Sequence, residues 1–276
     1  MKVSHLLLLA GLSAATLACG NRNDAMDNVT ENANKLDPSE AMANMEPQTS
    51  GDITLTPMPA TKDFPDAAIT DWTYSGGKFN YAATGYEFGV QTDDAGQIMC
   101  ANSVKGQHAH LIIDNEPYIA KYTPEFEQEV ADGNHYILSF LSRSYHESIK
   151  TEAAHRAVRT DVKNGAFVNP TDITEPMLFY SRPKGKYVGE NDTKNIMLDF
   201  YPLNVELSEG GYHVKATVNG KAEFDITSWQ PYFLSGLPMG ENTVELTLMK
   251  GSEMVKAPLN PVTRTFTLEA LPTESK

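Results

Sequence analysis

Residues 106–115, GQHAHLIIDN, have a counterpart in residues 211–220, GYHVKATVNG. In both runs, alternating side chains end at Asn or Gly, which is typical of an antiparallel strand that enters a turn. Each run is followed by a segment that bears aromatic residues and proline, and then by a second alternating strand, at residues 132–138 and 240–246. The shared order of these parts indicates an internal repeat.

The same short alternation recurs along the rest of the chain, whereas long helical periodicity is scarce. Residues 78–92 and 262–268 are the clearest further examples. Strands of this length, separated by Gly, Asn, Asp and Pro, predict an all-β protein of the sandwich type. We therefore expect two tandem Ig-like β-sandwich units, at residues 53–185 and 186–276, with their boundary in the polar stretch of residues 183–194.

The N-terminus has the form of a bacterial lipoprotein precursor. Lys2 precedes an apolar run at residues 6–12, which is too short to span a bilayer and predicts a cleaved signal peptide at residues 1–18. Residues 16–19, TLAC, resemble a lipobox, in which the cysteine is acylated, so Cys19 is the predicted lipid-bearing residue. We expect the lipid to anchor the protein in the cell envelope, in the outer membrane and facing the periplasm or the cell surface.

A polar segment separates the predicted anchor from the predicted body. Residues 20–63 contain no aromatic side chain, so they cannot bury enough apolar surface to offset the cost of ordering. Residues 19–52 are accordingly predicted to form a disordered tether. With Cys19 acylated, Cys100 has no intramolecular disulfide partner and is expected to pack as a small apolar residue.

The net charge limits the classes of partner. The chain has 22 Lys and Arg residues against 36 Asp and Glu residues, which gives a formal net charge of −14. This excess of negative charge argues against nucleic acid as a partner. We recognise no nucleophile, base and orienting group in a catalytic order, so the sequence predicts a binding protein rather than an enzyme.

Histidines are concentrated in the first unit of the repeat. Because side chains alternate along a strand, His108 and His110 share one face, and the cleaner pattern of the second unit predicts that this face is solvated. By the same comparison, His135 points outward from a neighbouring strand. Three imidazoles on rigid strands could hold Cu or Zn, so His108, His110 and His135 are the candidate metal ligands. The alternative is that these imidazoles bond to backbone and loop groups and only hold the sheet and loops in place.

A basic stretch suggests a different ligand. Its members are Arg143, Lys150, Arg156 and Arg159, with His146 and His155 among them. In an otherwise acidic protein such a stretch could hold a carboxylate or a phosphate, and the alternative is a solvated loop and strand face. The predicted ligand-binding residues are therefore His108, His110, His135, Arg143 and His146.

Several segments resemble one family of bacterial lipoproteins. They are residues 106–118 (GQHAHLIIDNEPY), 140–148 (FLSRSYHES), 179–185 (FYSRPKG), 237–241 (LPMGE) and 260–264 (NPVTR). Similar stretches occur in lipoproteins of Bacteroidetes, especially marine flavobacteria, and the resemblance covers most of residues 64–270. Members are often labelled phosphopeptide-binding proteins, so the resemblance implies a peptide or phosphopeptide ligand and carries over no catalytic residues. A structural or assembly role in the envelope, without a small-molecule site, is the remaining alternative.

Overall fold

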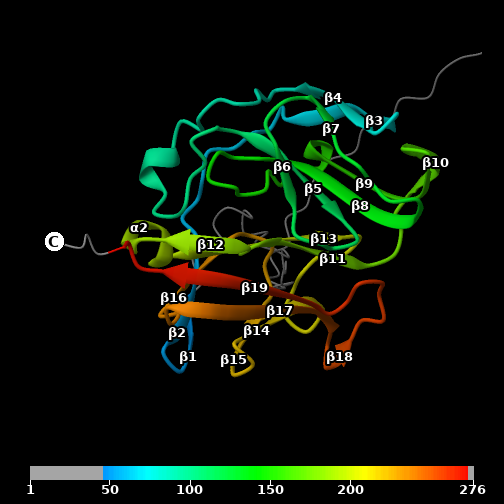
Figure 1. The fold of residues 1–276 in the computed structure, drawn as a ribbon. Coiled ribbons are helices and arrows are strands. Elements are labelled where there is room, and N and C mark those ends of the chain that lie inside the picture. The colour runs from blue at the N-terminus through cyan, green and yellow to red at the C-terminus, as the bar shows by residue number, and fades with distance from the viewer. Residues whose placement is uncertain (1–45, 273–276) are drawn as a thin grey trace, which may run out of the picture. The chain divides into compact units, whose positions relative to one another are not determined.

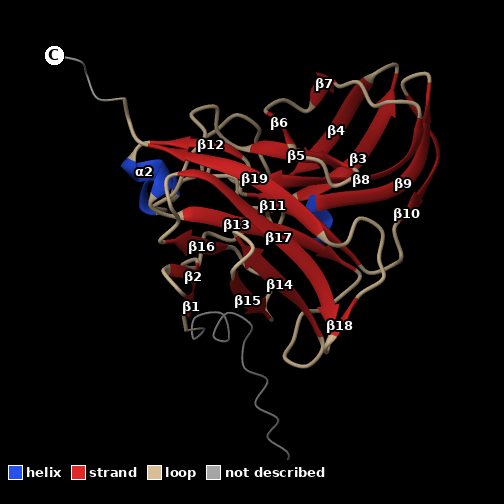
Figure 2. Ribbon diagram, turned by 60° about the horizontal axis from the view of Figure 1, so that its bottom comes forward, coloured by secondary structure: helices blue, strands red, loops and turns tan. Residues whose placement is uncertain are grey.

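The computed structural model describes residues 46–272, which are almost entirely strands and turns. The predicted signal peptide, Cys19 and most of the predicted tether lie outside the described residues. Helical structure within residues 46–272 is confined to the 3₁₀ turns η1 (Ala95–Gln97) and η2 (Glu152–Ala154) and to α2 (Glu190–Thr193), as Figure 2 shows. The all-β fold class is confirmed. No helix in this part of the chain is long and apolar enough to cross a membrane.

The strands of residues 46–272 form four sheets, called I to IV. Sheet I contains β3 (Ala68–Ser75), β4 (Lys78–Thr84) and β7 (Glu125–Glu127). Sheet II has the order β10 (Ala166–Asp172), β9 (His155–Lys163), β8 (Gly133–Ser142), β5 (His108–Ile113), β6 (Ile119–Lys121). Sheet III has the order β1 (Gln48–Ser50), β2 (Ile53–Pro57), β16 (Tyr232–Ser235), β13 (Ile196–Leu203), β11 (Met177–Arg182). Sheet IV has the order β12 (Gly185–Val188), β19 (Val262–Glu269), β17 (Gly240–Lys250), β14 (Tyr212–Val218), β15 (Ala222–Ile226), and β18 (Glu253–Met254) pairs with β17.

The four sheets pack in the order I, II, III, IV, because a hydrophobic core joins each consecutive pair. Figure 1 shows sheet I above sheet II. Representative pairs are Phe79 with Leu111 between sheets I and II, Phe140 with Phe179 between sheets II and III, and Leu198 with Leu246 between sheets III and IV. Sheet II is therefore covered on both faces. Both faces of β5 are buried, so the prediction that the His108 and His110 face is solvated is wrong.

The repeat predicted from the sequence corresponds to two antiparallel strand pairs, β5 with β8 and β14 with β17. Their registers differ by one residue relative to the sequence alignment, because Leu111 lies opposite Ser139 whereas Ala216 lies opposite Leu246. A slip of one residue moves every side chain of a strand to the other face. This slip places His135 on the face of sheet II opposite to that of His108.

Strand pairing also departs from the predicted division at residues 185 and 186. β2 lies in the first predicted unit, yet it pairs with β16 of the second, and β11 of the first unit pairs with β13 of the second. Sheet III thus combines strands from both sides of the division. Gln48–Ser50, at the end of the predicted disordered tether, is strand β1, because it pairs with a β2 whose Leu55 is buried in the core between sheets III and IV.

Candidate functional site

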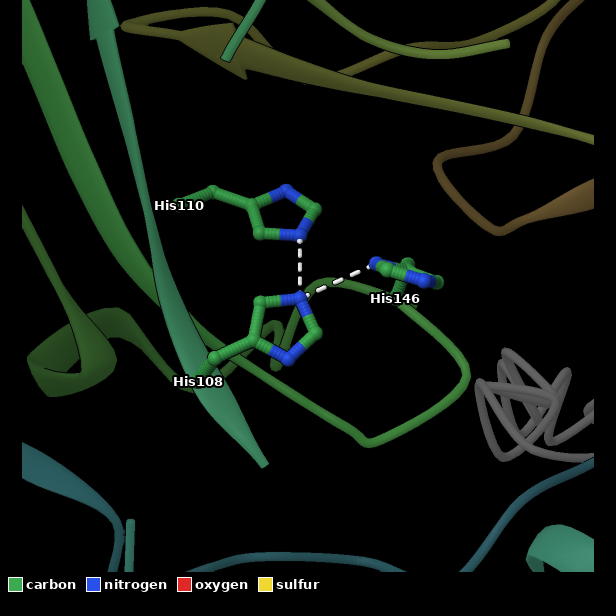
Figure 3. Close-up of side chains that lie close together, drawn as sticks. All are labelled: His108, His110 and His146. Carbon is green, nitrogen blue, oxygen red and sulfur yellow. Dashed lines mark hydrogen bonds between the residues drawn. The ribbon is translucent and has the colours of Figure 1, made fainter. Parts of the chain in front are cut away.

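Three histidines meet at the interface between sheets II and III (Figure 3). His108 and His110 lie on β5, and both are 0% exposed. His146 is partly buried and lies in the turn after β8. We call His108, His110 and His146 the histidine centre.

The turn after β8 directs His146 towards β5. Arg143 N–H donates a hydrogen bond to the carbonyl of Glu147 (2.9 Å), and His146 N–H donates to the carbonyl of Arg143 (2.9 Å). His146 has φ 73°, in the left-handed region that non-glycine residues rarely adopt. Strained backbone of this kind persists where the surroundings over-determine it, and it is concentrated at functional sites.

The ring nitrogens of the histidine centre converge. His108 Nε2 lies 3.0 Å from His110 Nε2 and 3.0 Å from His146 Nδ1. One nitrogen from each ring can be chosen so that all three lie within 4.8 Å of one another. With metal–nitrogen bonds of about 2.0–2.1 Å, nitrogens 3.0 Å apart subtend roughly 90° at a shared ion. The two 3.0 Å separations are therefore compatible with a metal ion bonded to His108 and to either neighbour, and coordination by all three rings requires the third pair of nitrogens to lie within about 4.2 Å.

Neighbouring groups orient each imidazole. His108 Nδ1 donates to the carbonyl of Gly106 (2.8 Å), and His110 Nδ1 lies 3.2 Å from Ser181 Oγ on β11. The Tyr118 hydroxyl lies 3.2 Å from His146 Nδ1, and the Tyr118 ring stacks on His110 with centroids 3.6 Å apart and planes inclined by 5°. His108 and His110 thus have partners on the second ring nitrogen, as is typical of metal-binding histidines, because such partners fix the tautomer and the ring orientation. Tyr118 instead contacts the same nitrogen of His146 that faces His108.

In the metal-free centre, two ring nitrogens compete for the lone pair of His108 Nε2. A carbonyl oxygen only accepts, so His108 Nδ1 carries the proton and the neutral ring keeps a bare lone pair on Nε2. Two ring nitrogens lie 3.0 Å from this single lone pair, and one lone pair makes one strong hydrogen bond. A cation at the focus would instead interact favourably with a lone pair from each ring.

The centre is held in the neutral form that metal binding requires. Burial lowers the pKa of His108 to about 4, and the positive charges of Arg182 and Lys184 add to this effect. Burial also lowers the pKa of His110 and His146 well below the usual value, with the same two cations contributing. At neutral pH the three imidazoles are therefore neutral, and each can offer one nitrogen lone pair to a metal.

His135 does not join the centre. Its Nδ1 lies 2.6 Å from Asp114 Oδ2 and its Nε2 lies 2.8 Å from the carbonyl of Ala131. Both ring nitrogens of His135 thus have protein partners, as expected for a histidine that fixes a turn. The predicted trio contained His135 where the structure has His146, because local alternation does not indicate how the turn after β8 folds back.

Arg143 lies apart from the histidines, in the wall of a cavity of 710 Å³. Arg143 Nη1 lies 3.4 Å from Glu147 Oε1, and Arg143 also donates to the carbonyl of Lys62. The Lys150 ammonium lies 3.1 Å from the carboxylate of buried Asp199. Each of the two cations in the cavity wall therefore has a carboxylate partner.

Other residues of the predicted basic stretch are dispersed over sheet II. The Arg159 guanidinium lies over the Tyr136 ring at 5.7 Å, and Arg156 lines a separate hollow beside His155. Cys100 packs at the edge of a small core that contains Tyr145, and burial raises the pKa of its thiol to about 12. This packing agrees with the apolar role predicted for Cys100.

Comparisons with known proteins give only distant likenesses. No protein-family model matches the chain, and no curated protein matches it in sequence. Fibronectin(III)-like modules of Clostridium thermocellum CbhA align with 13% identity over 73% of this chain and 92% of theirs, at a TM-score of 0.27. The central fibronectin-III array of RIM-binding protein aligns with 10% identity over 79% of this chain and 71% of its own, at a TM-score of 0.25. Bacteroides ovatus SGBP-B, solved in complex with a mixed-linkage heptasaccharide, aligns with 10% identity over 82% of this chain and 71% of its own, at a TM-score of 0.19. Scores this low carry no argument about function.

Proposed function

We propose that this is a metal-binding protein in which the histidine centre holds one first-row transition-metal ion. The observation that carries the proposal is the convergence of ring nitrogens from three neutral imidazoles, two of them 3.0 Å from His108 Nε2, with partners on the second ring nitrogen of His108 and His110. Imidazole is a good ligand for Cu and Zn. The role is binding rather than catalysis, because the 710 Å³ cavity is lined by other residues and His108 and His110 are 0% exposed.

Metal uptake by the purified full-length chain tests this function. After loading with Cu under reducing conditions, or with Zn, and removal of excess metal, elemental analysis is expected to find one ion per chain. His110→Ala should abolish this uptake. His213→Ala is the matched control, because His213 lies on β14, where its Nε2 is 3.3 Å from Asp225, and this variant should retain the ion.

X-ray absorption of the loaded protein is expected to show nitrogen donors, with histidine scattering from more than one ring. The proposal fails if no ion is retained, or if His110→Ala and wild type retain the same amount of metal. In the second case the metal binds elsewhere on the chain, and the centre is a structural hydrogen-bonding cluster.

A peptide ligand is the second candidate, favoured by the position of Arg143 in the wall of the 710 Å³ cavity. Because Glu147 and Asp199 balance the cations of this wall, it has little surplus positive charge for a phosphate. Binding of labelled peptides, with and without phosphate, tests this candidate. The double variant Arg143→Gln with Glu147→Gln removes both charges together and should abolish binding if the cavity is the site.

The proposed location is the cell envelope, with the lipid on Cys19 as the anchor. Cell fractionation tests it directly: the wild-type chain is expected in the membrane fraction, and a Cys19→Ser variant in the soluble fraction. Recovery of Cys19→Ser with the membranes would exclude Cys19 as the anchor.

A further inference from the structure

The histidine centre offers a bound ion no negative charge. Within residues 46–272 its clustered ligand groups are three imidazoles, which are neutral when they coordinate. The adjacent oxygen groups are the hydroxyls of Tyr118 and Ser181, which are uncharged. The buried carboxylate of Asp199 is compensated by the Lys150 ammonium at 3.1 Å. An ion in the centre would therefore keep its full charge.

Two cations flank the centre on the side of sheet III. Arg182, 5% exposed, follows directly after Ser181, whose hydroxyl contacts His110. The Lys184 ammonium lies 3.9 Å from the centroid of the Tyr118 ring, and the other face of this ring stacks on His110. Lys184 donates to the carbonyl of Tyr118 at 2.6 Å, and neither cation has a carboxylate partner among the described residues. Both positive charges therefore lie next to the centre, because Arg182 adjoins Ser181 and Lys184 lies over the ring that stacks on His110.

We propose that the centre selects a monovalent ion, Cu(I), over the divalent ions Zn(II) and Cu(II). This inference rests on the proposed function, because it presupposes that the three histidines bind a metal. Imidazole accepts all three ions, so the type of ligand does not discriminate between them. The charge of the ion and the number of ligands that it needs do discriminate between them.

The charge argument compares two energies. Repulsion by Arg182 and Lys184 is proportional to the charge of the bound ion, and it is therefore twice as large for Zn(II) as for Cu(I). The desolvation cost of burying an ion among neutral ligands rises with the square of its charge, which makes the difference larger. Both the repulsion and the desolvation cost therefore favour Cu(I) over the divalent ions.

The number of ligands that the centre supplies also favours Cu(I). Zn(II) in proteins is almost always four-coordinate. The centre supplies three nitrogens, and the stacked Tyr118 ring and the core between sheets II and III cover it. Cu(I), a closed-shell ion, is stable with two or three ligands.

Competition titrations of the full-length chain test the selectivity. The affinity for Cu(I) is measured without oxygen against a chromogenic Cu(I) chelator, and the affinity for Zn(II) against a fluorescent Zn(II) chelator. We expect Cu(I) to bind at least about a hundredfold more tightly than Zn(II). Lys184→Gln removes one cation and should strengthen Zn(II) binding roughly tenfold but Cu(I) binding only about threefold, because the repulsion doubles with the ionic charge.

Two further variants serve as controls. Lys186→Gln removes a positive charge from an exposed side chain paired with Glu269, and it should change neither affinity. Lys184→Arg keeps the charge and should preserve the ratio of the two affinities, so a loss of selectivity in both Lys184 variants would point to a packing effect and overturn the proposal.

The two proposals fail in different ways. Zn(II) binding as tight as Cu(I) binding, or equal gains for both ions in Lys184→Gln, would overturn the selectivity while leaving a metal centre. Failure of wild type to bind either ion would overturn the metal function itself.

Discussion

At the scale of the residue, the histidine centre combines groups that are far apart in the chain. His108 and His110 are neighbours on β5, whereas His146 reaches them from a turn in which its own backbone has φ 73°. Tyr118 and Ser181 complete the surroundings from a loop and from β11. Burial of these rings has a measurable effect on stability even without metal, because it disfavours their protonated forms.

The stability of the metal-free protein should fall as the pH is lowered from 7 to 5. In the unfolded chain His110 takes up a proton near its usual pKa of 6.5, whereas in the folded protein its pKa is well below that value. The unfolded state therefore binds more protons in this range, and the free energy of unfolding decreases by up to about 1.4 kcal/mol per pH unit for this residue. Above pH 6.5 His110 does not reduce the free energy of unfolding, and below it the free energy decreases as the pH falls towards the folded-state pKa of His110.

Urea unfolding in the presence of a chelator, at several pH values, measures this slope. His110→Gln removes the titrating group, so its free energy of unfolding should depend less steeply on pH than that of wild type. The difference between the two proteins cancels contributions from other groups, such as Glu147, whose pKa burial raises. Identical slopes would show that His110 is not protected from protonation in the folded state.

At the scale of the element, the turn that carries His146 is tied to β13 by a buried carboxylate. Asp199, 0% exposed, accepts hydrogen bonds from Ser148 N–H (3.2 Å), from the Ser148 hydroxyl (3.0 Å) and from the Lys150 ammonium (3.1 Å). These bonds join the segment after β8, in sheet II, to sheet III. They hold the His146 turn against the interface at which the centre lies.

Asp199→Ala should lower the free energy of unfolding by about 3 kcal/mol, because it leaves three donors, one of them a partly buried ammonium, without their acceptor. Chemical denaturation measures the loss. Glu269→Ala is the control, since its ion pair with Lys186 is exposed and should contribute no more than about 1 kcal/mol. Losses of equal size in the two variants would mean that Asp199 does not connect the sheets energetically.

At the scale of the whole described body, the core between sheets II and III joins the first strand pair of the repeat, in sheet II, to sheet III. Phe140 and Ile112 from sheet II share this core with Phe179 and Tyr201 from sheet III. Sheet III itself contains strands from before and after the division predicted at residue 185. We therefore expect residues 46–272 to unfold as one cooperative unit.

The two tryptophans allow this cooperativity to be measured. Trp72 lies on β3 and packs against the core between sheets I and II, whereas Trp229 packs against the cores on both sides of sheet III. In the single-tryptophan variants Trp72→Phe and Trp229→Phe, fluorescence and far-UV circular dichroism should give the same denaturation midpoint within each variant. Two separate transitions would show that the predicted units are independent domains.

The amino-acid sequence by itself determined the all-β class, the strand pairs of the repeat and the pairing of His108 with His110 on one face, because alternation along a strand is a local property. Only the tertiary structure decided that this face is buried, that His135 is excluded and that His146 takes its place. The register between β5 and β8 and the packing of sheet III onto sheet II join residues distant in the chain, and a single-residue slip in register reverses the faces. Periodicity within one strand does not contain that information.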